Sequence, residues 1–457
     1  MIRDWDNMPT EMLQKIGSVK EMLTTDNKGK PYQSKQNCVI VFENDPMLAG
    51  AFRWNEFTEN KAVVKELGWE RSGTEVTDAD MSFLYLYLER FYDLRCEKNI
   101  DHALTIVSNR LRFHPVRDLL NSLQWDGQER IRYVLHHFLG AEVSDLNYEV
   151  MKTFMLGAVE RVFHPGCKFE MMLCIVGTQG AGKSTFFRFL TMQDEWFSDD
   201  LRKLDDKDVY RKMRNHWIIE MAEMLGTSSA KSVEEIKAFI SRQKETYKDP
   251  YAKFPRDRPR QCVFVGTSNQ ERFLPLDRTG NRRFYPVQAD SEQAEVHILE
   301  NPEASREYMR QLWAEVMTIY RNGGWSLRLS AEMEHQMDLR RMDYMAEDTA
   351  TGTLQAWLDE YKGDFVCTRL IYNECYKMLG DPDPKAKSEI NSIMNNTIDG
   401  WERGPTHRFG GVYGTQRSWQ RVNRTCKQGE KADQGDGFVK LSDEECRQLN
   451  IDEIFGK

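Results

Sequence analysis

The sequence lacks long apolar runs and cysteine pairs, and each absence excludes a class of protein or site. No stretch approaches the ~18 apolar residues that cross a bilayer. Residues 1–6 lack the basic start and apolar segment of a signal peptide, which favours a location in the cytoplasm. We expect no membrane partner. The nine cysteines form no CxxC pair and no Cys/His group at zinc spacing. We therefore expect reduced, structural thiols and no metal-thiolate site.

Basic residues are also fewer than acidic residues. The net charge of −9 argues against nucleic-acid binding over the whole surface, although binding in a local channel needs only local positive charge. No internal repeat or low-complexity tract is present. With 457 residues, 40% hydrophobic and 30% charged, the chain has the composition of an ordinary multidomain protein.

The pattern of apolar residues predicts an α/β protein with four regions. Apolar runs at 171–176, 217–219 and 262–265 end in glycine or polar residues and alternate with helical segments, which indicates a parallel sheet buried on both faces. We expect this α/β core at 166–345. A helical lead-in is expected at 111–165, an accessory domain with a strand at 37–42 at 1–110, and a small domain at 346–457.

A complete phosphate-binding loop follows the first apolar run and precedes a helical segment. In such loops the backbone N–H groups surround the phosphates, a lysine reaches the β- and γ-phosphates, and a hydroxyl holds Mg²⁺. Lys183 and Ser184 fill the last two roles. The predicted ATP-binding residues are Gly177, Thr178, Gln179, Gly180, Ala181, Gly182, Lys183, Ser184 and Thr185.

Two carboxylates stand at the end of the second apolar run. One carboxylate can complete the Mg²⁺ shell and another can activate the attacking water. We assign Glu220 to the metal and Glu223 to the water, although the two roles are interchangeable. Alternatively, both residues cap the following helix.

Polar and basic residues follow the third run. The amide of Asn269 is placed to bind the γ-phosphate or the attacking water, or is an ordinary turn residue. Arg282 and Arg283 are candidates for a guanidinium that stabilises charge on the γ-phosphate of a neighbouring subunit. Surface ion pairs are the alternative for both arginines.

Residues 241–260 carry seven basic and three acidic side chains, a local charge of +4, with aromatic residues among them. Basic groups and aromatics together suit single- or double-stranded DNA, and three prolines indicate a projecting loop or hairpin. A solvated basic loop is the alternative. The predicted DNA contacts are Arg242, Lys244, Lys248, Tyr251, Lys253, Arg256 and Arg258. The stretch 401–427 is also basic, as in the wing of a winged-helix DNA-binding domain or a basic face packed on the core.

These motifs, in this order, resemble the virulence-associated protein E family of phages and mobile elements, which is related to superfamily 3 helicases of the AAA+ class. The resemblance covers roughly residues 30–325. It rests on segments 114–116, 125–131, 177–184, 217–223, 247–251, 266–269 and 279–284. The resemblance implies an AAA+-type fold and a hexameric ring, a homo-oligomer that hydrolyses ATP in the bacterial host cytoplasm. It also implies that the basic hairpin faces the ring's pore.

Two features depart from the family pattern. Met221 stands where Walker B motifs often have a second carboxylate, and no primase domain precedes the ATPase, so a separate primase is expected as partner. The sequence thus predicts an ATP-dependent DNA helicase for replication of a phage or mobile element. The alternative is a replication initiator that uses ATP only to assemble on DNA. A small-molecule P-loop kinase would leave the basic segment unexplained.

Overall fold

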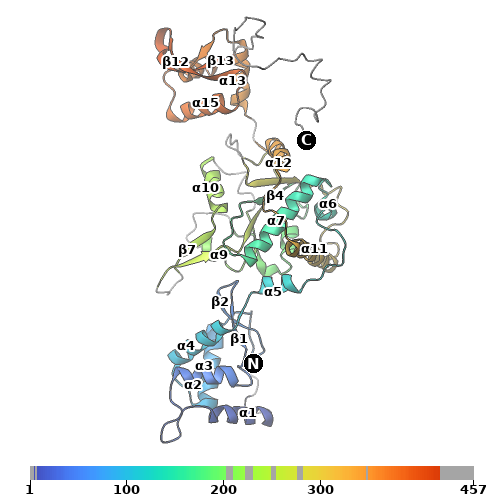
Figure 1. Ribbon diagram of the computed structural model, residues 1–457, viewed down its shortest axis with the longest axis vertical. Helices are drawn as coiled ribbons and strands as arrows, with labels where there is room; N and C mark the ends of the chain where they lie inside the picture. Colours follow the sequence, from blue (N-terminus) through green and yellow to red (C-terminus); the bar gives the residue numbers. More distant parts are fainter. Residues whose placement is uncertain are drawn as a thin grey trace, which may run out of the picture. The chain divides into compact units, whose positions relative to one another are not determined.

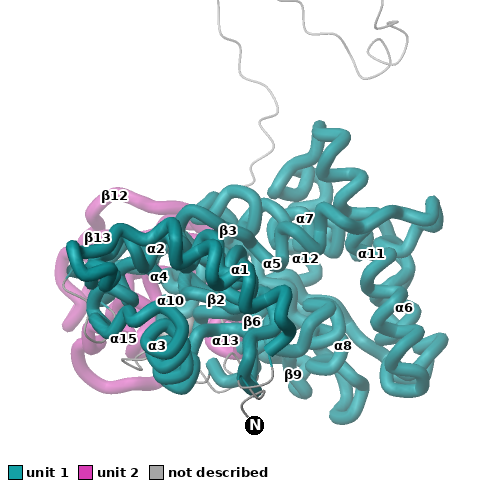
Figure 2. The backbone as a smooth tube through the Cα atoms, turned by 90° about the horizontal axis from the view of Figure 1, so that it is seen from below, with its two compact units in different colours: residues 1–347 teal, residues 348–457 magenta. Residues whose placement is uncertain are grey.

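The computed structural model of the chain describes Trp5 and residues 8–201, 209–221, 230–248, 254–274, 281–345 and 348–422. The chain divides into two compact units, residues 1–347 and 348–457 (Figures 1 and 2). Within the described ranges, no helix has the length and apolar character needed to cross a membrane.

The N-terminal region packs four helices and a three-stranded sheet around a core of its own. Buried apolar side chains between Trp5 and Val107 form this core, and the buried carboxylate of Asp45 accepts hydrogen bonds from Tyr87 and Tyr92. The sheet has the order β2-β1-β3. The elements are α1 (Thr10–Glu21), α2 (Lys35–Asn44), β1 (Phe52–Asn55), β2 (Asn60–Val63), α3 (Asp78–Tyr92), α4 (Glu97–Arg110) and β3 (Arg112–Phe113).

One prediction for this region is wrong. Residues 37–42 lie in helix α2 and not in a strand. The side chain of Ser34 caps this helix by accepting a hydrogen bond from the N–H of Asn37, and a short apolar run does not distinguish a helical segment from a buried strand. Strand β3 (Arg112–Phe113) pairs with β1 and belongs to the same sheet.

The centre of the first unit is a five-stranded parallel sheet of order β10-β4-β9-β6-β5. Strand β4 is buried along its whole length, as a strand covered by helices on both faces must be. The three predicted apolar runs form β4, β6 and β9. The strands are β4 (Met172–Val176), β5 (Phe197–Ser198), β6 (Ile218–Glu220), β9 (Val263–Ser268) and β10 (Phe284–Gln288).

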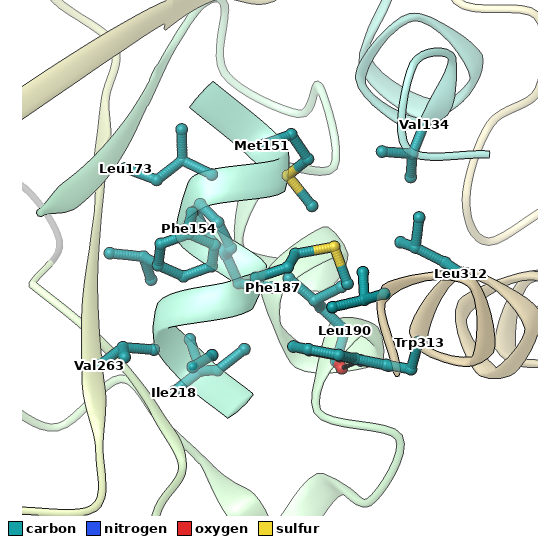
Figure 3. Close-up of a cluster of buried hydrophobic side chains, with 14 of the residues drawn as sticks. Val134, Met151, Phe154, Leu173, Phe187, Leu190, Ile218, Val263, Leu312 and Trp313 are labelled. Atoms are coloured by element: carbon teal, nitrogen blue, oxygen red, sulfur yellow. Dashed lines mark hydrogen bonds between the residues drawn. The ribbon is translucent and has the colours of Figure 1, made fainter. Parts of the chain in front are cut away.

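Helices cover the sheet and bury its side chains. Figure 3 shows Phe154 of α7, Phe187 and Leu190 of α8, and Trp313 of α11 converging on sheet residues such as Ile218. The indole of Trp313 donates a hydrogen bond to the carbonyl oxygen of Leu190 at 2.7 Å, so its one polar group is satisfied in the core. The helices are α5 (Pro115–Ser122), α6 (Val134–Leu139), α7 (Asp145–Phe163), α8 (Lys183–Leu190), α9 (Val209–Met213), α10 (Ala230–Ile240), α11 (Pro302–Asn322) and α12 (Ala331–Asp343).

The second unit is a small α+β fold with a three-stranded sheet of order β11-β13-β12, antiparallel at both pairings. Its elements run in the order helix, strand, two helices and a final β-hairpin. A separate apolar core between Leu354 and Trp419 holds it together. Its elements are α13 (Thr349–Glu360), β11 (Phe365–Val366), α14 (Thr368–Leu370) with a π-helical turn (Ile371–Cys375), α15 (Pro384–Asn396), β12 (Trp401–Phe409) and β13 (Gly414–Arg421).

Candidate functional site

The phosphate-binding loop connects the carboxyl end of β4 to the first turn of α8. Gly180 and Gly182 have φ angles of +85° and +77°, which only glycine adopts without strain. The N-terminus of α8 supplies N–H groups and the positive end of the helix dipole, both suited to phosphate. Thr178, Gln179, Gly180 and Ser184 are exposed, whereas Gly177, Ala181 and Lys183 are buried and Gly182 and Thr185 half-buried.

The ammonium group of Lys183 makes three hydrogen bonds within this edge of the sheet. It donates to the carbonyl oxygens of Gly177 at 2.8 Å and Thr178 at 2.7 Å, and to the side-chain oxygen of Asn269 at 2.8 Å. Burial lowers the pKa of Lys183, and the carboxylate of Glu220 opposes this shift. Asn269 therefore lies against the phosphate loop, as its predicted role requires.

The carboxyl group of Glu220 lies at the end of β6, fully buried, beside the phosphate loop. Its Oε1 accepts a hydrogen bond from the Ser184 hydroxyl at 2.8 Å and another from the Thr267 hydroxyl. Its Oε2 has no hydrogen-bond partner among the described residues. Burial raises the pKa of Glu220, and the two hydroxyl donors act in the opposite direction.

Because β4, β9 and β6 are parallel neighbours, their carboxyl ends meet at one edge of the sheet. The structure thus brings Lys183, Ser184, Glu220 and Asn269 together from three strands. Glu223 lies outside the described residues.

Sequence reasoning missed Thr267, which fixes the orientation of the Glu220 carboxylate. Its signal was present, because Thr267 is a hydroxyl residue at the end of the strand that precedes Asn269. It also missed Asp199, which follows β5 and whose negative charge contributes to the raised pKa of Glu220.

Arg282 and Arg283 lie at the opposite end of the sheet. They precede β10, whose first residue, Phe284, pairs with Met172 at the start of β4. Four residue steps of strand, roughly 13 Å, separate this edge from the phosphate loop. Neither arginine therefore lies at its own chain's nucleotide site.

The two arginines differ in their surroundings. The Arg283 side chain is 20% exposed and donates a hydrogen bond to the Ser241 hydroxyl at 2.7 Å. The Arg282 side chain is 69% exposed, with its nearest carboxylate, Glu170, at 4.0 Å. Arg283 is thus fixed within the chain and Arg282 is accessible.

The predicted basic segment forms an antiparallel hairpin, β7 (Lys244–Tyr247) and β8 (Arg256–Pro259), that projects from the core (Figure 1). The cations of Arg242, Lys248 and Arg256 are exposed, as is Lys244, which pairs with Asp257. The Phe254 side chain is 74% exposed. Tyr251 and Lys253 lie outside the described residues.

Arg258 does not fit the prediction of a DNA contact. It is buried, its guanidinium lies 4.7 Å from the centre of the Tyr247 ring, and it forms an ion pair with Glu59 of the N-terminal region. The Arg258 charge is therefore used inside the chain, because a buried guanidinium needs a carboxylate partner.

The parallel sheet, the glycine loop and the lysine, hydroxyl and carboxylate groups at one edge are typical of an α/β P-loop NTPase fold. Residues 120–346 match the sequence profile of the virulence-associated protein E-like domain. Residues 120–346, which include the phosphate loop, are therefore similar to this domain.

Three structures of the C-terminal region of NrS-1, two of them titled apo A forms, are similar to the chain at 9–10% identity. Their TM-scores are 0.44, 0.47 and 0.43. The similarity covers 81% of this chain and 95–96% of those chains. No curated protein matches the chain.

Proposed function

We propose that this chain is an ATP-hydrolysing motor that moves along or unwinds DNA in the replication of a phage or mobile element, as a homo-oligomeric ring of hexameric type. The observation that carries the proposal is the cluster of Lys183, Ser184, Glu220 and Asn269 in one chain with an exposed, basic and aromatic hairpin. A nucleotide site explains the cluster, and a nucleic-acid track explains the hairpin.

The residues at the sheet edge fit an ATP·Mg²⁺ complex. A buried carboxylate oxygen without a hydrogen-bond donor, as at Glu220 Oε2, is a suitable metal or metal-water ligand, and the Ser184 hydroxyl lies beside it. Mg²⁺ would neutralise charge on the phosphates. Lys183 would exchange its carbonyl partners for phosphate oxygens, and Asn269 would hold the γ-phosphate or the attacking water. Glu223 is the proposed base.

The positions of the arginines favour action between subunits. Because the strand length separates Arg282 from its own phosphate loop, it can contact a γ-phosphate only in a neighbouring copy of the chain. Its exposure leaves it free to do so. We assign the stabilising guanidinium to Arg282 and a supporting role to Arg283, which is tied to Ser241 in the short segment between α10 and the hairpin.

The hairpin supplies the proposed DNA contact. Arg242, Lys248 and Arg256 offer charge to the sugar-phosphate backbone, and Phe254 offers a ring on which a base can stack. Hydrolysis at the sheet edge would then be coupled to movement of the hairpin along the pore.

The test is ATP hydrolysis by the full chain with and without single-stranded DNA, for wild type and Lys183→Ala. We expect Lys183→Ala to abolish both rates and Lys15→Ala, an exposed lysine of α1, to leave both unchanged. Hydrolysis by Lys183→Ala at the wild-type rate would contradict the proposal.

A second candidate, an initiator that assembles on DNA without unwinding it, is favoured by the basic hairpin of the C-terminal unit. A forked DNA substrate separates the two functions. Strand displacement that requires ATP and Arg282 supports the motor. ATP-dependent assembly on duplex DNA without displacement supports the initiator.

A further inference from the structure

One face of the β12–β13 hairpin carries exposed basic and hydroxyl side chains. Thr406 pairs with Arg417 and Arg408 pairs with Thr415, and residues that are paired or two apart on a strand share a face. All four are exposed. The opposite face carries His407, whose ring stacks on Phe365 at 4.3 Å.

The two arginines of this face are not used within the unit. In the described range 348–422, the side chains of Arg408 and Arg417 form no ion pair or hydrogen bond, and no acidic side chain lies opposite either one on the hairpin. Arg421, nearer the base of the same hairpin, lies 4.8 Å from the centre of the Trp401 ring and donates to the carbonyl oxygen of Leu358. Arg408 and Arg417 are therefore available to an anionic partner.

Helix α15 presents a polar stripe on its outer side. Its inner side buries Ile390, Ile393 and Met394. The side opposite, by helical periodicity, carries Lys385, Ser388, Ser392 and Asn395, of which only Ser392 is not fully exposed. The stripe holds no carboxylate and no large apolar residue.

The stripe and the two arginines lie on the same side of the unit. Asn395 Oδ1 accepts hydrogen bonds from Trp419 Nε1 and Arg403 Nε, both at 3.0 Å. Trp419 follows Arg417 by two residues on β13, so both side chains point to the face that meets α15. The outer stripe of α15 thus continues into the basic face of the hairpin.

We propose that residues 348–422 bind double-stranded DNA, with α15 in the major groove and Arg408 and Arg417 on the flanking phosphates. An α-helix, about 10–12 Å across, fits a major groove of about 12 Å. Lysine, serine and asparagine are short polar readers of base edges, and arginine pairs with phosphate. A single strand is a poorer fit, because the stripe offers no ring on which bases stack. This binding goes beyond the motor function, which requires no recognition of sequence.

The test measures binding of the full chain to a labelled random-sequence duplex by fluorescence anisotropy over a range of salt concentrations. All variants carry Phe254→Ala and Arg256→Ala, so that the β7–β8 hairpin does not mask the result. We expect Arg408→Ala with Arg417→Ala to weaken duplex binding at least about tenfold and to reduce the slope of log K against log salt by about 1.8, since each phosphate contact contributes ~0.9.

Lys362→Ala is the matched control, because Lys362 is an exposed cation of the same unit in the α13–β11 connection. It should leave affinity and slope unchanged. Circular dichroism should show the same helix and strand content for all these variants. Unchanged duplex affinity in the double arginine variant, or a loss confined to single strands or RNA, would overturn the proposal.

Selection from a pool of random duplexes tests the reading of bases. Ser388→Ala with Ser392→Ala should abolish enrichment of a preferred sequence while non-specific affinity is retained. Enrichment of the wild-type sequence by this variant would refute the placement of α15 in the groove. Lys183→Ala should select the same sequence as wild type, so failure of the motor proposal would leave this result intact.

Discussion

The two basic hairpins, β7–β8 and β12–β13, use their arginines in the same divided way. Near the base of each hairpin the guanidinium groups bind the chain itself, as Arg260 binds Glu245 and Arg421 binds the carbonyl oxygens of Leu358 and Tyr361. Towards the tip, Arg256 and Arg417 are exposed. Arg260 and Arg421 thus fasten each hairpin to its domain, whereas Arg256 and Arg417 are available to a partner.

The difference between bound and exposed arginines shows that the net charge of a segment overstates the number of charges that a partner can contact. The +4 of residues 241–260 includes Arg258 and Arg260, both buried. Four variants test the division between buried and exposed side chains. They are given in order of their expected effect on the free energy of unfolding.

Arg260→Ala should have the largest effect. The Arg260 guanidinium is buried, pairs with Glu245 and donates to the carbonyl oxygen of Phe239 at 2.7 Å. Removing one partner of a buried ion pair costs about 3–5 kcal/mol, because the other charge stays buried alone. Urea denaturation followed by fluorescence measures the loss. Arg256→Ala in the same hairpin is the control and should change stability by less than ~0.5 kcal/mol. Equal losses in both variants would contradict the comparison.

Arg421→Ala should destabilise the C-terminal unit by about 1–3 kcal/mol, since two carbonyl acceptors lose a charged donor. Arg417→Ala, four residues away on the same strand, should be within ~0.5 kcal/mol of wild type. Calorimetry of the full chain, in which the two units are expected to unfold in separate transitions, is the measurement. A larger loss of stability in Arg417→Ala than in Arg421→Ala would contradict the assignment of Arg421 to the stabilising role.

Glu220→Gln tests a buried charge with too few partners. Burial raises the pKa of Glu220, so ionisation above that pKa costs stability, and this cost is absent at lower pH where the carboxyl is protonated. Glu220→Gln should therefore raise the melting temperature of the nucleotide-free protein near pH 7.5, and the gain should shrink as the pH falls through the raised pKa. The same variant should lose Mg²⁺-dependent hydrolysis. A lower melting temperature at pH 7.5 would show that the ionised carboxylate is stabilising.

Phe254→Ala should have the smallest effect on stability, less than ~0.5 kcal/mol, because the side chain is 74% exposed. Its effect on DNA should be clear, since stacking on one ring contributes ~1–3 kcal/mol per base. Affinity for single-stranded DNA should fall about tenfold while hydrolysis without DNA is retained. Tyr32→Ala, an exposed aromatic of the N-terminal region, is the control. Unchanged DNA affinity of Phe254→Ala would contradict the proposed contact between the hairpin and DNA.

The core and the nucleotide site were predictable because their signals are local. A buried parallel strand, a glycine loop and a strand ending in Glu220 each appear in a short segment of sequence, and parallel pairing brings them to one edge. Helix α2 was not predictable from its apolar run, because a short run of this kind fits a helix or a buried strand, and the cap from Ser34 favours the helix. The burial of Arg258 depends on Glu59, about 200 residues earlier in the chain, so no local pattern indicates it.

The three hydrogen bonds of Lys183 affect the energetics of nucleotide binding. An ammonium group has three donors, and all three already have acceptors in Gly177, Thr178 and Asn269. A phosphate that binds here therefore replaces existing hydrogen bonds of Lys183. The net gain in binding free energy is then smaller than the number of new contacts would suggest. When a product leaves the proposed site, the ammonium group would return to these three acceptors, so the site would not be left with an unpaired buried cation.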